Sequence, residues 1–132
     1  MNAFVVELPN RPGELARLAE AVADKGINIT SISAAGSGSG GAIGFVTNDM
    51  DGTRQALDQA GITYRSVELV AAALEDRPGT LAQAARRLAD ASVNIELLLP
   101  TGMSGSRVTV AFGVDDASSA RQALGELASV EA

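Results

Sequence analysis

Along this chain, segments with the hydrophobic pattern of a β-strand are followed by segments with the pattern of an amphipathic helix. Residues 3–8 are rich in β-formers and stop at Pro9, which predicts a short strand. An apolar stripe with helical spacing follows: Leu15, Leu18, Ala19 and Val22. This i, i+3, i+4, i+7 pattern predicts a helix whose first turn contains Pro12 and which stops at Gly26.

The same two periods predict the rest of the chain. In the first half we expect a strand over 27–35, a glycine-rich loop over 36–41, a strand over 42–47, a helix over 51–60 and a strand over 62–67. In the second half we expect a strand over 69–74, a helix over 78–91, a strand over 93–99, a loop over 101–106, a strand over 107–112, a helix over 118–128 and a short strand over 130–132.

The order of elements repeats because the sequence itself repeats. Residues 10–16, Asn-Arg-Pro-Gly-Glu-Leu-Ala, return at 76–82 as Asp-Arg-Pro-Gly-Thr-Leu-Ala, and residues 54–57, Arg-Gln-Ala-Leu, return unchanged at 121–124. Such self-similarity indicates a duplicated supersecondary unit. We therefore predict the α+β class, with two tandem ferredoxin-like β-α-β-β-α-β units over 1–67 and 68–132, each an antiparallel sheet with helices on one face.

Composition narrows the chemistry. The formal net charge of −6, with scattered basic residues, argues against nucleic acid and anionic membranes as partners. The sequence holds no histidine and no cysteine, which excludes imidazole bases, disulfides and thiolate sites, and we expect no metal and no cofactor. We find no apolar run of about 18 residues and no signal-peptide pattern, so a cytoplasmic protein is expected.

Several polar residues recur in both halves. Asp49 and Asp51 correspond to Asp116 and Ser118, and all four precede or open the second helix of a unit. Capping of the helix N-terminus is the favoured interpretation, and paired acid–base catalysis is the alternative. The repeated Asn28 and Asn94 are interpreted as structural, bonding backbone at a strand start, with ligand contact as the alternative.

The turn between the first strand and the first helix is the candidate site of each unit. Gly13 and Gly79 follow a proline where a side-chain-free residue would let another group approach the exposed N–H groups of the helix start. These amides suit a carboxylate, while Asn10 and Asp76 are placed to meet an ammonium group. An α-amino acid would supply both groups. The alternative is that Pro-Gly only shapes a tight turn, and the repeated Arg11 and Arg77 are either anion-attracting or simply solvated.

The motif Asn-Arg-Pro-Gly-x-Leu-Ala, followed by a helix and Gly-Ile-Asn-Ile, resembles the ACT domain, a small regulatory module that binds amino acids. It occurs twice, over 8–32 and 74–98, with Asp76 in place of Asn10 and Ser92 in place of Gly26 in the second copy. The resemblance implies paired units in a continuous sheet that often dimerise, with an effector bound between units near the Pro-Gly turn. In serine-binding members an asparagine at the position of Asn10 contacts the effector. The chain looks like a stand-alone protein of two such units.

From these observations we predict a non-enzymatic, allosteric regulatory protein that senses a small amino acid, forms a homodimer and acts on a metabolic enzyme. The alternative is an interaction module that docks on such an enzyme without a ligand, through edge strands over 27–35 and 93–99. No catalytic residue is predicted. The ligand-binding candidates are Asn10, Arg11, Pro12, Gly13, Glu14 and Leu15 in the first turn, and Asp76, Arg77, Pro78, Gly79, Thr80 and Leu81 in the second.

Overall fold

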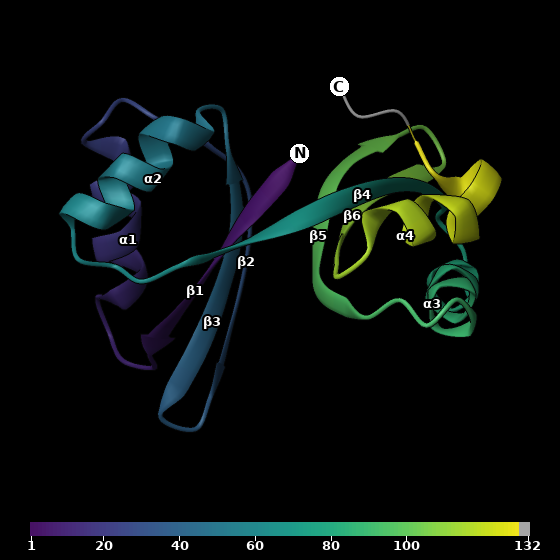
Figure 1. Ribbon diagram of the computed structural model, residues 1–132, viewed down its shortest axis with the longest axis horizontal. Helices are drawn as coiled ribbons and strands as arrows, with labels where there is room; N and C mark the ends of the chain where they lie inside the picture. Colours follow the sequence, from purple (N-terminus) through teal and green to yellow (C-terminus); the bar gives the residue numbers. More distant parts are fainter. Residues whose placement is uncertain (130–132) are drawn as a thin grey trace. The chain divides into compact units, whose positions relative to one another are not determined.

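The computed structural model describes residues 1–129 and divides the chain into two compact units (Figure 1). Residues 3–66 form the N-terminal unit, and the C-terminal unit contains Met1 and Asn2 together with the chain from Val67 onward. Met1 belongs to the second unit because its carbonyl accepts a hydrogen bond of 2.9 Å from the Leu69 N–H. The first strand therefore begins in one unit and continues in the other.

The N-terminal unit is an antiparallel sheet covered on one face by two helices (Figure 1). Its elements are β1 (Asn2–Pro9), α1 (Glu14–Ala23), β2 (Ile29–Ser37), β3 (Gly40–Thr47) and α2 (Met50–Gln59). β3 pairs with β1, in register Phe4 to Phe45, and with β2 on its other side. Phe4 and Phe45 are fully buried against Leu18 of α1 and Leu57 of α2. Of the predicted apolar stripe, Leu18 and Val22 belong to this core, whereas Leu15 is exposed.

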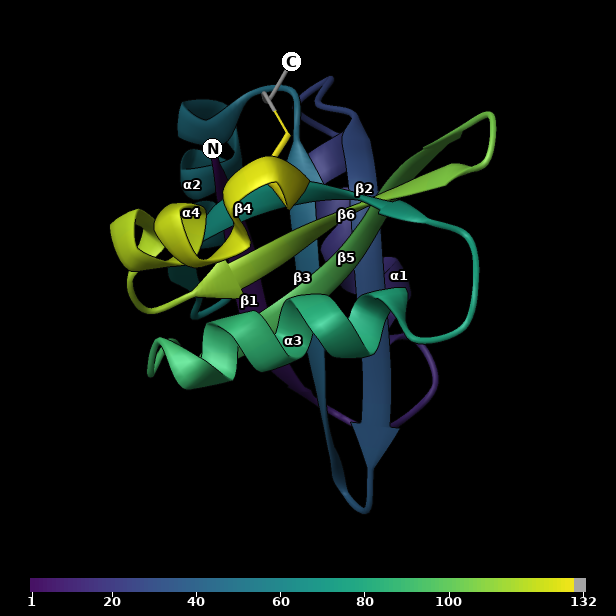
Figure 2. The same cartoon turned by 90° about the vertical axis from the view of Figure 1, so that its right-hand side faces the viewer.

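The C-terminal unit repeats this plan, with its helices α3 and α4 over one face of its strands (Figure 2). Its elements are β4 (Arg65–Glu75), α3 (Thr80–Asp90), β5 (Ile95–Ser104), β6 (Arg107–Val114), α4 (Ala117–Leu124) and a short 3-10 helix η1 (Gly125–Leu127). β6 pairs with β4 and with β5, and both pairings are antiparallel. The predicted α+β class with tandem ferredoxin-like units is confirmed.

The strands predicted over 62–67 and 69–74 form one continuous strand, as the almost uninterrupted strand pattern over 62–74 indicates. Ile62 is not in a strand, because its N–H closes the end of α2 on the Leu57 carbonyl at 2.9 Å and its side chain is buried in the core. The strand starts only at Arg65. The predicted final strand over 130–132 lies outside the described residues. Just before it, the Ser129 N–H donates to the Ala71 carbonyl at 2.9 Å.

The two predicted loops over 36–41 and 101–106 are mostly strand. Each hairpin closes in two residues, Gly38-Ser39 and Gly105-Ser106, with φ of 59° and 60° at the glycine. Glycine at the first central position with positive φ is typical of such tight hairpin turns. Neither hairpin leads into a helix, as a phosphate-binding loop would. Among residues 1–129 no helix is long and apolar enough to cross a bilayer.

Candidate functional site

The two Pro-Gly turns have the same backbone geometry. Gly13 has φ 93° and ψ −12°, and Gly79 has φ 91° and ψ −11°, which are the values of the third residue of a type II turn. A side chain is strained at such φ, so backbone conformation alone accounts for both glycines. The helices begin only after them, at Glu14 and Thr80, and the prediction that the prolines lie in the first helical turn is wrong.

Each turn still presents backbone N–H groups at a helix start. The first helical hydrogen bond of α1 runs from the Arg17 N–H to the Gly13 carbonyl, and that of α3 from the Gln83 N–H to the Gly79 carbonyl, both at 2.9 Å. The N–H groups that precede these donors have no partner within the helix, and they lie at the positive end of the helix dipole. A Cβ on Gly13 would meet nothing within 4 Å, so the space beside the turn is open.

Glu14 changes the charge of the first turn. Its side chain is only 12% exposed and lies between Arg11, 3.2 Å away, and Arg17, 3.5 Å away. A carboxylate in the first turn is stabilised by the helix dipole, so Glu14 already supplies negative charge there. A ligand ammonium would be attracted to Glu14, and a ligand carboxylate would have to lie on the side of Arg11. In the second turn the corresponding residue is Thr80, whose hydroxyl donates to the Glu75 carbonyl at 2.8 Å.

Asn10 and Asp76 occupy the same backbone position. The Asn10 N–H donates to the Ser39 carbonyl at 2.9 Å, and the Asp76 N–H donates to the Ser106 carbonyl at 2.8 Å. The Asn10 side chain makes a further bond, from Nδ2 to the Gly38 carbonyl at 3.0 Å. One N–H of its amide group is thus engaged within its own unit, and Oδ1 can still accept a hydrogen bond from a ligand.

A cavity of about 180 Å³ lies beside the first turn. Four of the six predicted residues line it, namely Asn10, Arg11, Glu14 and Leu15, whereas Pro12 and Gly13 are not among its lining residues. The opposite wall comes from the β2–β3 hairpin and was not predicted. It consists of small and apolar residues: Ala34, Ala35, Gly36, Gly41, Ala42 and Ile43.

The second turn borders a smaller cavity of about 130 Å³. Arg77 and Thr80 line it, while Asp76, Pro78, Gly79 and Leu81 do not. Its other polar walls include Glu75 and Arg107, which form an ion pair at 3.2 Å. The positions that correspond to the small residues Gly36 and Ala42 of the first unit are Met103 and Thr109 here. The two sites are therefore chemically different.

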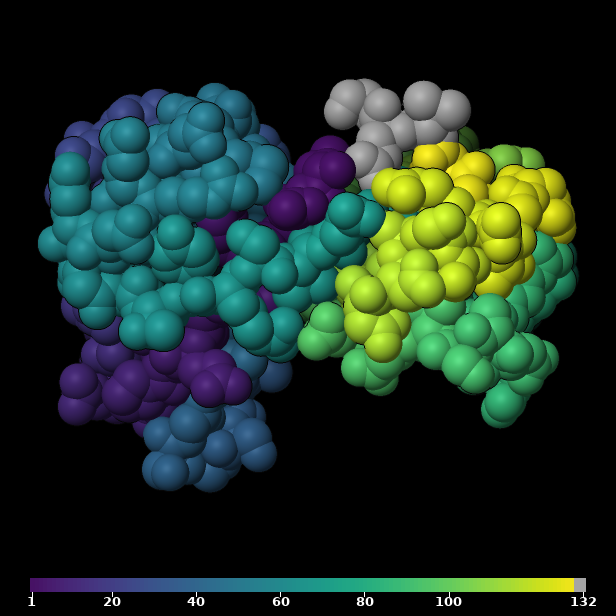
Figure 3. Space-filling view, viewed as in Figure 1, coloured from purple at the N-terminus to yellow at the C-terminus, as the bar shows by residue number. Residues whose placement is uncertain are grey.

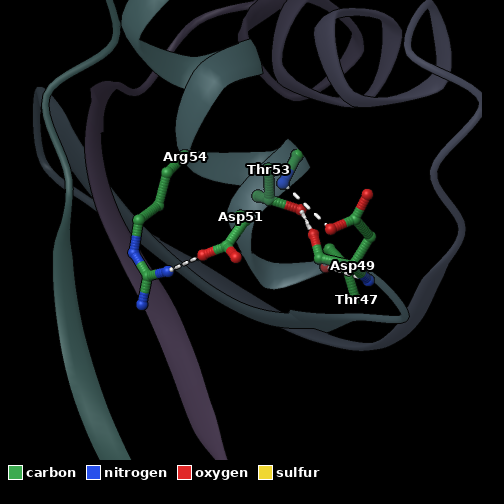
Figure 4. A network of polar contacts seen from close by, with 6 residues as sticks. Thr47, Asp49, Asp51, Thr53 and Arg54 are labelled. Carbon is green, nitrogen blue, oxygen red and sulfur yellow. Dashed lines mark hydrogen bonds and ion pairs between the residues drawn. The ribbon is translucent and has the colours of Figure 1, made fainter.

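Two of the four repeated residues, Asp49 and Asp116, cap helices as the favoured interpretation predicts, whereas Asp51 and Ser118 lie within the first turns of α2 and α4. Asp49 Oδ1 accepts from the Gly52 N–H at 2.9 Å, and Asp116 Oδ1 accepts from the Ser119 N–H at 3.0 Å. The Ser119 backbone and hydroxyl bonds lower the pKa of Asp116. Asp51 instead pairs with Arg54 at 2.8 Å (Figure 4). Beside the cap, the buried hydroxyls of Thr47 and Thr53 lie 2.7 Å apart.

Asn28 and Asn94 act through their backbone rather than their side chains. The Asn28 N–H donates to Asn48 Oδ1 and the Asn94 N–H donates to Asp115 Oδ1, both at 3.0 Å. The side chains that bond backbone at these strand starts are Asn48 and Asp115, which sequence reasoning missed, and Asn28 and Asn94 contribute the N–H groups that they bond. Asn48 and Asp115 could have been found from the repeat, because they occupy equivalent positions just before the second helix of each unit. Among the described residues no group of His, Cys, Asp or Glu is arranged to hold a metal ion.

Residues 3–60 match the family model of the ACT domain. An aspartokinase of Corynebacterium efficiens is 31% identical to this chain over 139 residues, which cover 92% of the chain and 32% of the relative. The chain thus spans about a third of the length of that enzyme.

Solved structures show the same fold over nearly the whole chain. A protein from Bacteroides thetaiotaomicron has a TM-score of 0.77 at 21% identity, covering 95% of this chain and 86% of its own. The ligand-free regulatory subunit of aspartate kinase from Thermus thermophilus has a TM-score of 0.65 at 20% identity, covering 96% and 90%. The N-terminal unit matches the ACT domain over residues 3–60, and the second unit has the same plan of elements.

Proposed function

We propose that this chain is a regulatory module that binds a small amino acid in the cavity beside the first Pro-Gly turn and catalyses no reaction itself. The observation that carries the proposal is the composition of that cavity. Arg11, Glu14 and Asn10 supply a cation, an anion and a neutral amide at one end, and Leu8, Leu15 and Ile43 supply apolar surface. A zwitterion with a short side chain needs this combination.

The charges suggest how the ligand would lie. Its ammonium group would face the Glu14 carboxylate and Asn10 Oδ1, because both can only accept from it. Its carboxylate would face the exposed Arg11 guanidinium and the free N–H groups of the first turn of α1. The cavity beside the turn has a volume of about 180 Å³, and a second pocket of about 560 Å³ shares its lining residues Leu8, Pro9, Ala35, Gly41 and Ala42.

The comparisons support regulation rather than catalysis. Residues 3–60 match the ACT domain, and members of this family are regulatory modules that bind amino acids. The match to aspartokinase covers only about a third of that enzyme. We therefore expect the chain to act on the catalytic part of a metabolic enzyme, in the cytoplasm and as a homodimer. A contribution to the ligand site from a second unit, in this chain or in another copy, stays a prediction.

A thermal-shift screen against the twenty amino acids tests the proposal. A ligand at a hundredfold excess over its dissociation constant stabilises the folded protein by about 2.7 kcal/mol. For a chain of this size, that raises Tm by roughly 5–15 °C. We expect one or a few small amino acids to do so. If none raises Tm at millimolar concentration, amino-acid binding is wrong.

The alternative, a docking module without a ligand, is favoured by one observation. β2 is an edge strand of its sheet, and Ile32 on it is 41% exposed. This function predicts that the chain co-purifies with one metabolic enzyme to the same extent with and without amino acids. Co-purification that depends on an amino acid would favour sensing instead.

A further inference from the structure

The tip of the β2–β3 hairpin, residues 36–41, reads Gly-Ser-Gly-Ser-Gly-Gly and projects from the N-terminal unit (Figure 3, blue atoms at the lower edge). It carries few side-chain atoms with which to hold itself in place. Asn10 holds it twice, through its N–H to the Ser39 carbonyl at 2.9 Å and through Nδ2 to the Gly38 carbonyl at 3.0 Å. We infer that the Asn10 side chain is a latch that fixes the hairpin tip against the Pro-Gly turn.

Gly36 makes room for this latch. A Cβ at Gly36 would lie 2.8 Å from Cγ, Nδ2 and Oδ1 of Asn10 alike, so the amide group lies directly on the glycine. Gly36 does not have positive φ, and its backbone conformation is therefore one that any residue adopts. The requirement for glycine at this position is one of space for the Asn10 side chain. Gly36 is thus a positioning residue for the latch.

The second unit lacks this latch and holds its hairpin differently. Asp76 replaces Asn10 and cannot donate a hydrogen bond when ionised, and Met103 replaces Gly36. There Glu75 makes the contacts, accepting from the Ser106 hydroxyl and from Arg107 Nε, each at 3.2 Å. The corresponding positions of the first unit are Pro9, Ser39 and Gly40, which cannot form that ion pair. In each unit, therefore, a different side chain bonds the hairpin to the residues at the turn.

The latch has a consequence for the cavity, and this part rests on the proposed function. Gly36 and Gly41 of the hairpin line the cavity opposite Glu14 and Leu15. By holding the tip, Asn10 keeps this wall in place before a ligand arrives, so less ordering is needed on binding. A loosened tip should weaken ligand binding even where every charged group of the cavity is retained.

The latch is tested by backbone ¹⁵N relaxation without any ligand. Asn10→Asp keeps the size of the side chain but removes its donor, and Gly36→Ala displaces the side chain, whose flexible end can swing away without unfolding the protein. In both variants we expect the order parameters of residues 37–39 to fall from about 0.85 to below about 0.6. In Gly36→Ala the Asn10 side-chain NH₂ signals should move to those of a solvated asparagine.

Two controls isolate the latch. Gly40→Ala adds a Cβ to the same tip, where it meets nothing within 4 Å at an ordinary φ, and should leave the tip rigid. Asp76→Asn should not change residues 104–106, because Met103 occupies the place of Gly36. A rigid tip in both Asn10→Asp and Gly36→Ala, with the Asn10 signals unmoved in the latter, would overturn the latch. Because no ligand is present, this outcome is independent of whether an amino acid binds.

Discussion

Asn10 and Asp76 stand at the same residue position of the two units and give their N–H to equivalent serine carbonyls. Their surroundings differ. Asn10 lies in the larger cavity with Arg11 and Glu14, whereas Asp76 is not among the lining residues of the smaller one. These surroundings favour the first turn as the amino-acid site, although the backbone of the Pro-Gly turn is the same in both units.

We predict that Asn10→Ala weakens amino-acid binding much more than Asp76→Ala does. A hydrogen bond to a charged group contributes about 1.5–3 kcal/mol, so Asn10→Ala should lower the affinity roughly 10- to 150-fold, and loss of the latch acts in the same direction. Asp76→Ala should change it less than about threefold. Calorimetric titration measures both. Equal losses would mean equivalent sites, and a loss confined to Asp76→Ala would reverse the ranking.

At the scale of elements, the ends of the first helices show how the copies have diverged. α3 ends with the Val93 N–H on the Leu88 carbonyl at 2.9 Å and the Ser92 N–H on the Ala89 carbonyl at 2.9 Å, the Schellman arrangement. In this arrangement the first residue after the helix, here Ser92, must have positive φ. Ser92 has φ 58°, and at the corresponding position of α1 Gly26 has φ 73°. Serine is strained in this region and glycine is not.

This difference predicts that exchanging serine and glycine at the two helix ends has opposite effects on the free energy of unfolding. Ser92→Gly should raise the free energy of unfolding by about 0.5–1 kcal/mol, because about 1–2 kcal/mol of strain is relieved and the greater freedom of glycine in the unfolded chain costs part of that. Gly26→Ser should lower it by a similar amount. Urea unfolding of the two variants measures both. The same sign in the two variants would contradict this explanation of the helix ends.

A second element-scale feature is the contact between α3 and the end of α4. Arg87 Nη1 donates to the Leu124 carbonyl and Nη2 to Glu126 Oε1, both at 2.8 Å. The bond from the Arg87 guanidinium lowers the pKa of Glu126 below its ordinary value. A group with a lowered folded pKa stabilises the protein above its unfolded pKa of about 4.3, and this contribution disappears as the pH falls through the folded value.

We therefore predict that Glu126→Gln lowers Tm at pH 6–7 and that the difference from the unaltered protein shrinks as the pH falls and the Glu126 carboxylate becomes protonated. Thermal unfolding at a series of pH values measures this difference. Asp90→Asn is the matched control, because the Arg86–Asp90 pair is exposed and 3.8 Å long and should contribute little. A Glu126→Gln difference that stays constant with pH would mean that the ion pair does not stabilise the fold.

At the scale of the whole molecule, the repeat in the sequence accounts for the fold. The apolar stripes around Leu18 and Leu88 are local patterns, and they form the predicted helices and cores. The predicted start of a strand at Ile62 was wrong because the Ile62 N–H closes the end of α2, and apolar character alone does not reveal that hydrogen bond.

The candidate site was predictable only in part, for a similar reason. The turn is a continuous motif, so its residues could be found in the sequence. The cavity wall over 34–36 and 41–43 lies about twenty or more positions away, and the pairing of β3 with both β1 and β2 brings it to the turn. Its run of alanine and glycine was visible but was interpreted as part of a strand and a loop. The engagement of the Asn10 donor by Gly38 likewise depends on the folded hairpin.

The most direct test of the central claim is a ¹H–¹⁵N NMR titration of the unaltered chain with the amino acid that raises Tm most. We predict saturable shifts concentrated in the amides of residues 10–17 and 34–43, which surround the cavity, and smaller shifts around 76–83. Because Glu14 and Arg11 pair with each other, the Arg11 side-chain Nε–H signal should shift as well. Saturable shifts confined to other parts of the chain, or no saturable shifts at all, would contradict binding at the first Pro-Gly turn.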